Sequence, residues 1–171
     1  RLPAPRTVAR LAWDKAKGFA TKAFTIIFVA SVVIWFLQTF DVRLNVVDDQ
    51  SASMLAALGT LLAPLFAPLG FGNWRAAAAL AAGFGAKENV VATLTVLMGG
   101  STAALPELFS PLTAFAFLTF TLLYTPCVAA VSAVRGELGT KMMWAVIAMQ
   151  CGVAWVVALA VRLAGMALGL G

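Results

Sequence analysis

The chain of 171 residues is 62% hydrophobic, only 11% charged and has a mean hydropathy of +0.95. Soluble domains carry about 45–50% apolar and about 25% charged residues, so the composition excludes an ordinary soluble protein and indicates an integral membrane protein. The net charge is +5, and half of the twelve basic residues lie in the first 22 positions. We expect this basic end in the cytoplasm. We expect no nucleic-acid partner, because the basic residues abut a predicted membrane span and no aromatic platform accompanies them.

Several classes of chemistry are also excluded. Histidine is absent, which removes histidine-based catalysis and histidine-ligated metals. The two cysteines, Cys127 and Cys151, both lie in apolar segments, so we expect thiols and no disulfide, and we interpret Cys151 as a packing residue. No segment matches the phosphate-binding pattern G-x-x-x-x-G-K-S/T, and there is no signal-peptide pattern. We therefore expect no enzymatic activity in this chain, which we interpret as a piece of a longer protein.

The first forty residues predict a surface helix followed by a membrane span. Residues 1–22 place apolar and basic side chains on opposite faces, which predicts a basic amphipathic helix on the inner membrane surface. Gly18 is a point where this helix could bend into the bilayer. Residues 23–40 carry no charge and are long enough for about 27 Å of helix. We predict a first span at 23–40 and one membrane domain over 23–171.

The next segment is too short and too rich in proline to span. Residues 41–53 are acidic, which fits the outer side of the membrane. Ser51 or Ser53 is expected to cap an interfacial helix over residues 54–63. Pro64 is expected to end this helix, with an extended turn after it.

Residues 74–98 admit two interpretations. They could form one span of 25 residues, or a re-entrant hairpin with a helix over 74–83, a tip at 84–87 and a returning helix over 88–98. The hairpin would place Arg135 and Lys141 on the cytoplasmic side, and the single span would place them outside. The distribution of positive charge therefore favours the hairpin.

The last third predicts a broken span and an intact one. Pro111 is suited to the first position of a helix, so we predict a span over 111–134, interrupted at Thr-Pro-Cys and resuming at Val128. Residues 135–139 form a predicted polar turn, and the last span is expected at 141–163. The predicted fold class is an all-α polytopic membrane protein with a re-entrant hairpin and a broken helix.

The centre of the hairpin carries the first candidate site. The segment Gly-Phe-Gly-Ala-Lys-Glu-Asn begins at Gly83 and places two glycines, Gly83 and Gly85, before Lys87, Glu88 and Asn89. A charged side chain at the bilayer centre costs about 2.5–3.5 kcal/mol on insertion scales, so such residues usually line a pathway. The glycines are expected to loosen the helix, and irregular backbone at this depth usually lines a site. Lys87 is expected to balance Glu88 until a cation displaces it.

The second candidate site lies at the break in the following helix. Pro126 has no N–H to donate to the carbonyl of Leu122, so a free carbonyl and the hydroxyl of Thr125 are expected beside it. Cys127 then opens the next half-helix, where the helix dipole favours a thiolate. A thiolate with oxygen ligands suits a borderline divalent ion such as Fe(II) better than Na⁺ or Mg²⁺.

The hypothesis is therefore a cation path through the middle of the membrane, where two broken segments each present an anionic ligand. Its ligands are Cys127, Glu88 and Thr125, and its supporting residues are Lys87, Asn89, Gly83, Gly85, Pro126 and Tyr124. Two other interpretations stay open. In one, the lysine–glutamate pair only holds helices together and the cysteine is core filler; in the other, the chain is half of a transporter for a nucleoside or other organic solute.

A family resemblance points the same way. The motifs Gly-Phe-Gly-Ala-Lys-Glu-Asn-Val-Val from Gly83 and Leu-Leu-Tyr-Thr-Pro-Cys-Val-Ala from Leu122 are similar to those of the ferrous iron transport protein B family. Two further segments share the likeness: Leu-Ala-Pro-Leu-Phe-Ala-Pro-Leu-Gly-Phe from Leu62 and Asn-Trp-Arg-Ala-Ala from Asn73. More loosely, the amphipathic helix, hairpin and broken helix resemble one gate repeat of nucleoside transporters.

The resemblance implies an importer of Fe(II) in the cytoplasmic (inner) membrane, with the N-terminus in the cytoplasm. Fe(II) would be the transported ion, and no cofactor would be bound permanently. The implied partners are the lipid bilayer, a GTP-hydrolysing domain and a first gate repeat elsewhere in the same protein, and small accessory Feo proteins. This chain would be the second gate repeat, with self-association expected through the surface that the first repeat covers. Carried over by motif, Cys127 would be the thiol that handles metal, and Glu88 and Asn89 would belong to the polar hairpin.

Overall fold

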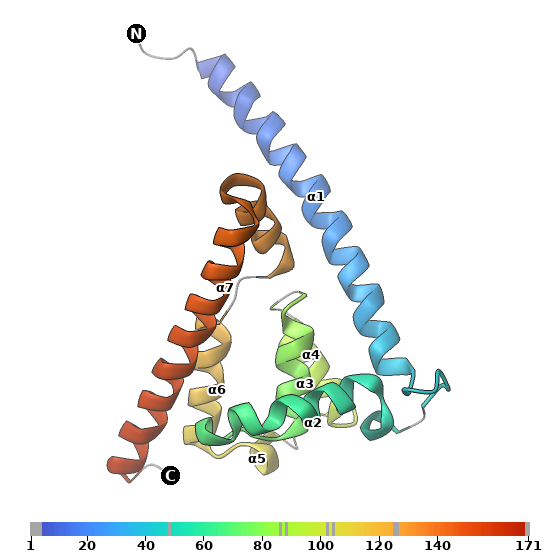
Figure 1. The fold of residues 1–171 in the computed structure, drawn as a ribbon, viewed down its shortest axis with the longest axis vertical. Helices are drawn as coiled ribbons and strands as arrows, with labels where there is room; N and C mark the ends of the chain where they lie inside the picture. The colour runs from blue at the N-terminus through green and yellow to red at the C-terminus, as the bar shows by residue number, and fades with distance from the viewer. Residues whose placement is uncertain are drawn as a thin grey trace.

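The computed structural model describes residues 5–47, 49–85, 87, 89–101, 103, 105–124 and 127–169. Over these residues the chain is built from helices joined by short turns, as predicted for an all-α protein. In chain order they are α1 (Pro5–Thr39), η1 (Gln50–Ala52), α2 (Met54–Phe66), η2 (Ala67–Leu69), α3 (Trp74–Gly83), α4 (Asn89–Leu97), α5 (Leu105–Leu108), α6 (Pro111–Leu123) and α7 (Val128–Ala167). In Figure 1, α1 and α7 form two sides of the molecule, and α2 runs across one end.

Helix α1 does not divide where the sequence suggested. The surface helix over 1–22 and the span over 23–40 were predicted as separate segments, whereas one helix of 35 residues runs through both, about 52 Å at 1.5 Å per residue. Gly18 lies inside this helix without bending it into two. A single glycine costs only about 1 kcal/mol in a helix interior, which is too little to break a helix of this length.

The loop after α1 is ordered by its own carboxylates. The carboxylate of Asp41 accepts hydrogen bonds from the backbone amides of Arg43 and Asn45, at 2.7 and 2.9 Å. Asp49 accepts one from the amide of Ser51 at 3.0 Å and so caps η1. These backbone hydrogen bonds, with that of Asn45 the largest for Asp41, hold the pKa of both carboxyl groups below the ordinary value.

Helix α2 starts as predicted and ends later. Ser53 caps it by accepting a hydrogen bond from the amide of Ala56, which confirms one of the two predicted caps. The prediction that Pro64 ends the helix is wrong, because the helix continues to Phe66. Phe66 is 7% exposed and packs against Phe71 and Phe120, with ring centroids 5.7 and 5.3 Å away. This aromatic packing offsets the roughly 3 kcal/mol that an internal proline costs.

Helices α3 and α4 form an antiparallel hairpin. At its open end, Nε of Arg75 donates to the carbonyl of Leu97 at 3.2 Å; at its closed end, Gly83 packs against Val90. The chain therefore reverses between these helices and does not continue as one helix of 25 residues. Helix α2 meets α3 at 104° and crosses it closely, because a Cβ on Gly59 would lie 2.4 Å from the backbone oxygen of Trp74.

Helices α6 and α7 pack against each other through small residues. Ser110 caps α6. Pro111 is the first residue of this helix, as predicted. Ala154 and Ala158 of α7 are fully buried. A Cβ on Gly165 would lie 2.1 Å from Cδ1 of Leu112, so the leucine side chain would have to shift to admit any larger residue.

The predicted polar turn at 135–139 is mostly helical. Helix α7 includes residues 135–138, and only Gly139 leaves the helical region, with φ of 81° and ψ of 171°. Figure 1 shows the chain reversing direction near this point. Among the described residues, Ala130–Ala167 is the one helix long and apolar enough to cross a membrane by length and composition, or one of two if the bent α2–α3 pair counts as a span.

Candidate functional site: two helix breaks that meet

The break after α6 leaves two carbonyls without their helical partners. In a continuous helix, the carbonyls of Leu122 and Tyr124 would accept from the amides of residues 126 and 128. Residue 126 is proline and has no N–H. The amide of Val128 donates elsewhere, to the carbonyl of Phe84 at 3.1 Å. In an apolar surrounding, both carbonyls therefore need other donors.

Lys87 supplies those donors. Its Nζ lies 3.1 Å from the carbonyl oxygen of Leu122 and 3.0 Å from that of Tyr124, the same two oxygens that lost their helical partners. The ammonium also lies over the ring of Tyr124, 5.0 Å from its centroid. A cation at the C-terminal end of a helix is favoured by the helix dipole, and the ring adds a cation–π attraction.

The exchange between the two breaks is reciprocal. The hairpin end supplies the lysine that satisfies the end of α6, and the start of α7 supplies the amide that satisfies Phe84, the residue after α3. Segments about forty positions apart in the sequence therefore complete each other's hydrogen bonding. Each break leaves backbone carbonyls without a helical hydrogen-bond donor, and the other break supplies that donor. These hydrogen bonds hold the two breaks together.

Tyr124 fixes this meeting from the side of α6. Its side chain is 6% exposed and its ring stacks on Phe120, 5.5 Å between centroids. The hydroxyl donates to the carbonyl of Leu80 at 3.4 Å, one turn before the end of α3. A Cβ on Gly83 would lie 2.6 Å from this hydroxyl, so Gly83 makes room for the tyrosine. Helix α3 ends at this glycine, and the missing side chain also allows this close approach.

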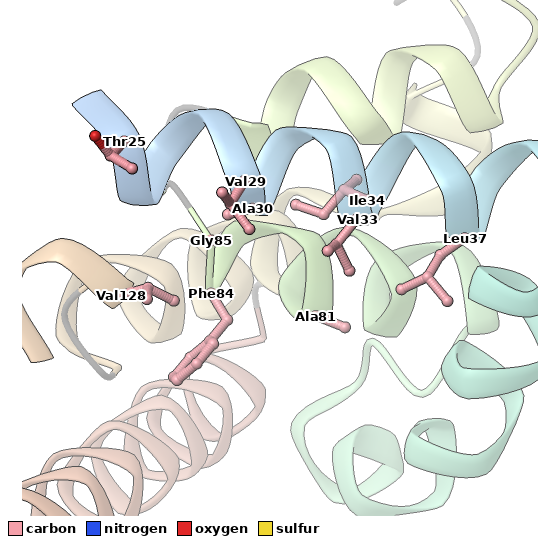
Figure 2. A pocket seen from close by; sticks show the side chains of 10 residues that line it. All are labelled: Thr25, Val29, Ala30, Val33, Ile34, Leu37, Ala81, Phe84, Gly85 and Val128. Atoms are coloured by element: carbon pink, nitrogen blue, oxygen red, sulfur yellow. The ribbon is translucent and has the colours of Figure 1, made fainter. Parts of the chain in front are cut away.

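Gly85 plays the same part toward α1. A Cβ there would lie 3.0 Å from Cδ1 of Ile34 and 3.3 Å from Cβ of Ala30. Beside this contact is a pocket of about 460 Å³ between α1 and the end of α3. Figure 2 shows its apolar lining, with Phe84 on one side, α1 on the other and Val128 at the edge.

The predicted ligands are only partly visible. Cys127 is a half-buried thiol at the position preceding α7, where its side chain makes no capping hydrogen bond. Asn89 is half-buried and is the first residue of α4. Glu88, Thr125 and Pro126 lie outside the described residues. Among the residues that the structure does describe, no group of three Cys, Asp or Glu side chains could hold a metal ion.

One residue interpreted as packing lies close to the site. Cys151 of α7 lines a second pocket, of about 380 Å³, together with Phe84 and Tyr124. No helix breaker or charge marks Cys151 in the sequence, so its position could only come from the fold.

Two further polar anchors were also missed. Nη1 of Arg162 in α7 donates to the carbonyls of Ala67 and Pro68 in η2, the first at 3.2 Å. Nε1 of Trp155 donates to the carbonyl of Leu65 at 3.1 Å. These three bonds tie the end of α2 and the following η2 to α7. A lone arginine inside a predicted span was the available signal, because such a charge must find a partner.

Comparison with known proteins gives a consistent result. Residues 20–141, more than half of the chain, match the model of the Gate family, described as nucleoside recognition. The chain is 44% identical over 142 residues to a protein named Fe(2+) transporter FeoB from Staphylococcus aureus (strain COL), and 32% identical over 175 residues to one of the same name from Methanocaldococcus jannaschii. These matches cover 80% and 96% of this chain.

A third relative, from Porphyromonas gingivalis, is named as a fusion of Fe(2+) transport protein A with Fe(2+) transporter FeoB and is 29% identical over 211 residues, covering 92% of this chain. The matched regions make up only 21%, 26% and 25% of the three relatives, so the chain spans about a quarter of their length. No solved structure matches the chain. The relatives are named transporters, which makes this chain part of a membrane protein, and by the family match it belongs to the Gate family, in the form similar to that of Fe(2+) transporters FeoB.

Proposed function

We propose that this chain forms half of the path by which a longer protein moves Fe(II) across the cytoplasmic membrane. One observation carries the proposal: the two interrupted segments lie together, joined by the bonds from Lys87 to Tyr124 and from Val128 to Phe84. Paired broken helices meeting inside the membrane are the usual construction of a transporter site. The names of the relatives supply the ion.

In this proposal the ligands come from both sides of the meeting point. Cys127 lies three residues beyond Tyr124, and Glu88 directly follows Lys87. The thiolate and the carboxylate would bind Fe(II) directly, and Thr125 and the carbonyls freed by Pro126 would assist. A site with a small number of protein ligands suits a transport path, because an ion that passes through must be held weakly enough to leave.

The lengths of α3 and α4 support a re-entrant hairpin. With 10 and 9 residues, they rise about 15 and 14 Å, near half of the roughly 30 Å hydrocarbon layer. We propose that the hairpin enters to mid-depth and returns to the same side, and that α1 starts in the cytoplasm. Lys87 would then lie deep in the membrane, and its bonds to backbone carbonyls would offset its desolvation.

The rest of the protein would supply the remaining parts. We propose that it carries a first gate repeat, which completes the path, and a GTP-hydrolysing domain; this chain itself would have no catalytic role. An accessory Feo protein is a further partner, and the relative in which protein A is fused to FeoB supports it. Without the first repeat, the exposed apolar side chains of α1, such as Phe24 and Phe28, give a surface for self-association.

The test is Fe(II) uptake by the intact protein in cells that lack other ferrous importers. Cys127→Ser and Glu88→Gln are expected to reduce uptake at least about tenfold, because each removes an anionic ligand of the ion. The matched control is Cys151→Ser, which alters a neighbouring thiol outside the proposed ligand set. Near-normal uptake in both site variants, at equal protein levels, would contradict the proposed site.

The alternative of an organic solute has less support. The pockets next to the breaks are lined almost wholly by apolar side chains, including Val33, Leu37 and Phe84, whereas a nucleoside needs several hydrogen-bonding groups. Binding measured in parallel with Fe(II), Mn(II) and nucleosides separates the two functions. Nucleoside binding without metal binding would favour the alternative.

A further inference from the structure

Lys87 occupies the position that a passing cation would use. Its ammonium lies between two backbone carbonyls freed by a helix break and next to an aromatic face, at 3.1, 3.0 and 5.0 Å. Freed carbonyls of this kind coordinate ions in membrane pathways. The ammonium of Lys87 therefore lies at the same carbonyls that would help to coordinate the ion in the proposed path.

The proposed ligands are sequence neighbours of both partners in this contact. Glu88 adjoins Lys87, and Cys127 follows Tyr124 by three positions. A divalent ion bound by these ligands would be close to the ammonium, and like charges repel strongly where little water screens them. The ion and the ammonium therefore compete for the same carbonyl oxygens.

We propose that Lys87 is a tethered cation that closes the path when no metal is bound and leaves the carbonyls of Leu122 and Tyr124 when Fe(II) enters. This inference rests on the proposed function. The contact is also a latch, because it joins the hairpin end to the end of α6. After Lys87 leaves, the hydrogen bond from Val128 to Phe84 still joins the two breaks, so the hairpin end is loosened without being lost.

The first experiment compares metal affinity in the intact protein, reconstituted in lipid nanodiscs without oxygen. Lys87→Met keeps the length of the side chain and removes the charge. It is expected to bind Fe(II) at least about fivefold more tightly than the unmodified protein, because the competing cation is gone. Lys87→Arg keeps a cation and is expected to bind no more tightly than the unmodified protein. Lys141→Met is the control, since it removes the same charge from an exposed lysine of α7.

The second experiment needs no variant and so does not depend on whether Lys87→Met folds. The amine of Lys87 is acylated with a small ester reagent and the rate is followed by peptide mass spectrometry. Saturating Fe(II) is expected to accelerate modification of Lys87 several-fold, because the released amine is no longer held by carbonyls, and to leave Lys141 unchanged.

The outcomes separate the two proposals. If the unmodified protein binds Fe(II), but Lys87→Met binds it equally or more weakly and Fe(II) does not speed acylation, Lys87 is a structural cap and the tethered-cation proposal is overturned while the path remains. If neither protein binds Fe(II), and loss of Cys127 has no effect on uptake, both proposals fall. Tighter binding by Lys87→Met together with faster acylation of Lys87 supports both.

Discussion

Two basic side chains in this molecule perform the same task in different settings. Arg162 caps the carbonyls of Ala67 and Pro68 at the end of η2, and Lys87 caps those of Leu122 and Tyr124 at the end of α6. In both places a helix ends within apolar surroundings, and a distant cation satisfies the carbonyls that the ending exposes.

The settings differ in what holds the cation. Arg162 belongs to the last two turns of α7, and Trp155, two turns earlier, bonds to the same region. Lys87 lies in a turn between two short helices and next to a proposed metal ligand. A guanidinium stays charged and keeps a fixed geometry, whereas an ammonium on a flexible stem is more easily displaced. The same kind of hydrogen bonding is therefore a fixed joint at Arg162 and, in the proposal above, a releasable contact at Lys87.

Replacing the fixed joint should have the largest effect on stability. Arg162→Leu leaves two carbonyls without their charged donor, so we expect a loss of about 3 kcal/mol in the free energy of unfolding. Unfolding in mixed micelles of increasing denaturing detergent measures it. Arg162→Lys retains a donor and should recover part of the loss. An unchanged free energy of unfolding for Arg162→Leu would show that the guanidinium is not a joint.

The second largest loss of stability is expected from adding a side chain where the two breaks meet. A Cβ on Gly83 would lie 2.1 Å from Cγ2 of Val90 and 2.6 Å from the hydroxyl of Tyr124. Gly83→Ala is therefore expected to cost about 2 kcal/mol through overpacking and to lower Fe(II) uptake. Gly152→Ala is the matched control, because a Cβ there meets nothing within 4 Å. An unchanged unfolding curve for Gly83→Ala would contradict the close approach of the two breaks.

Two substitutions of Tyr124 separate the role of its hydroxyl from that of its ring. Tyr124→Phe deletes the bond to the carbonyl of Leu80 and keeps the ring beneath Lys87, so we expect a loss of about 1 kcal/mol. Tyr124→Leu also removes the ring and should cost more, since the cation–π contact is lost as well. The difference between the two unfolding free energies measures what the ring adds. A difference of zero would mean that the carbonyls alone hold the lysine.

The smallest expected effect is that of low pH on the loop between α1 and η1. Backbone hydrogen bonds lower the pKa of Asp41 and Asp49 in the folded state, so each carboxylate stabilises the loop at pH values above its unfolded pKa of about 3.9. This contribution is lost as the pH falls through the folded pKa values. Hydrogen exchange at the amides of Asn45 and Ser51 should accelerate below about pH 4 relative to the core. Asp41→Asn should remove the acid sensitivity at Asn45 and leave Ser51 unaffected.

Local features of the sequence anticipated many of the elements. The cap at Ser53, the start of α6 at Pro111 and the restart of α7 at Val128 follow from short-range stereochemistry, which neighbouring residues determine. The position of Pro126 alone identified Leu122 as a carbonyl in need of a partner. The close approaches at Gly83 and Gly85 were not anticipated, because they depend on how near distant side chains come to the missing Cβ atoms.

Other predictions failed, and in one of them tertiary contacts outweighed a local preference. Pro64 did not end α2, because Phe66 gains an aromatic core beyond it. The polar stretch 135–139 stayed mostly helical, with its turn confined to Gly139. No single-sequence signal placed Cys151 beside Tyr124, because their proximity depends on how α6 packs on α7.

The sequence by itself determined that this is a helical membrane protein with two interrupted segments, because apolar length, proline and buried charge act on the chain locally. Only the tertiary structure decided that the interruptions complete each other, with Lys87 on the carbonyls of α6 and Val128 on the carbonyl of Phe84. The reason is physical: an unpaired backbone group inside an apolar layer accepts any donor within reach, and only the packing of the helices determines which donor that is.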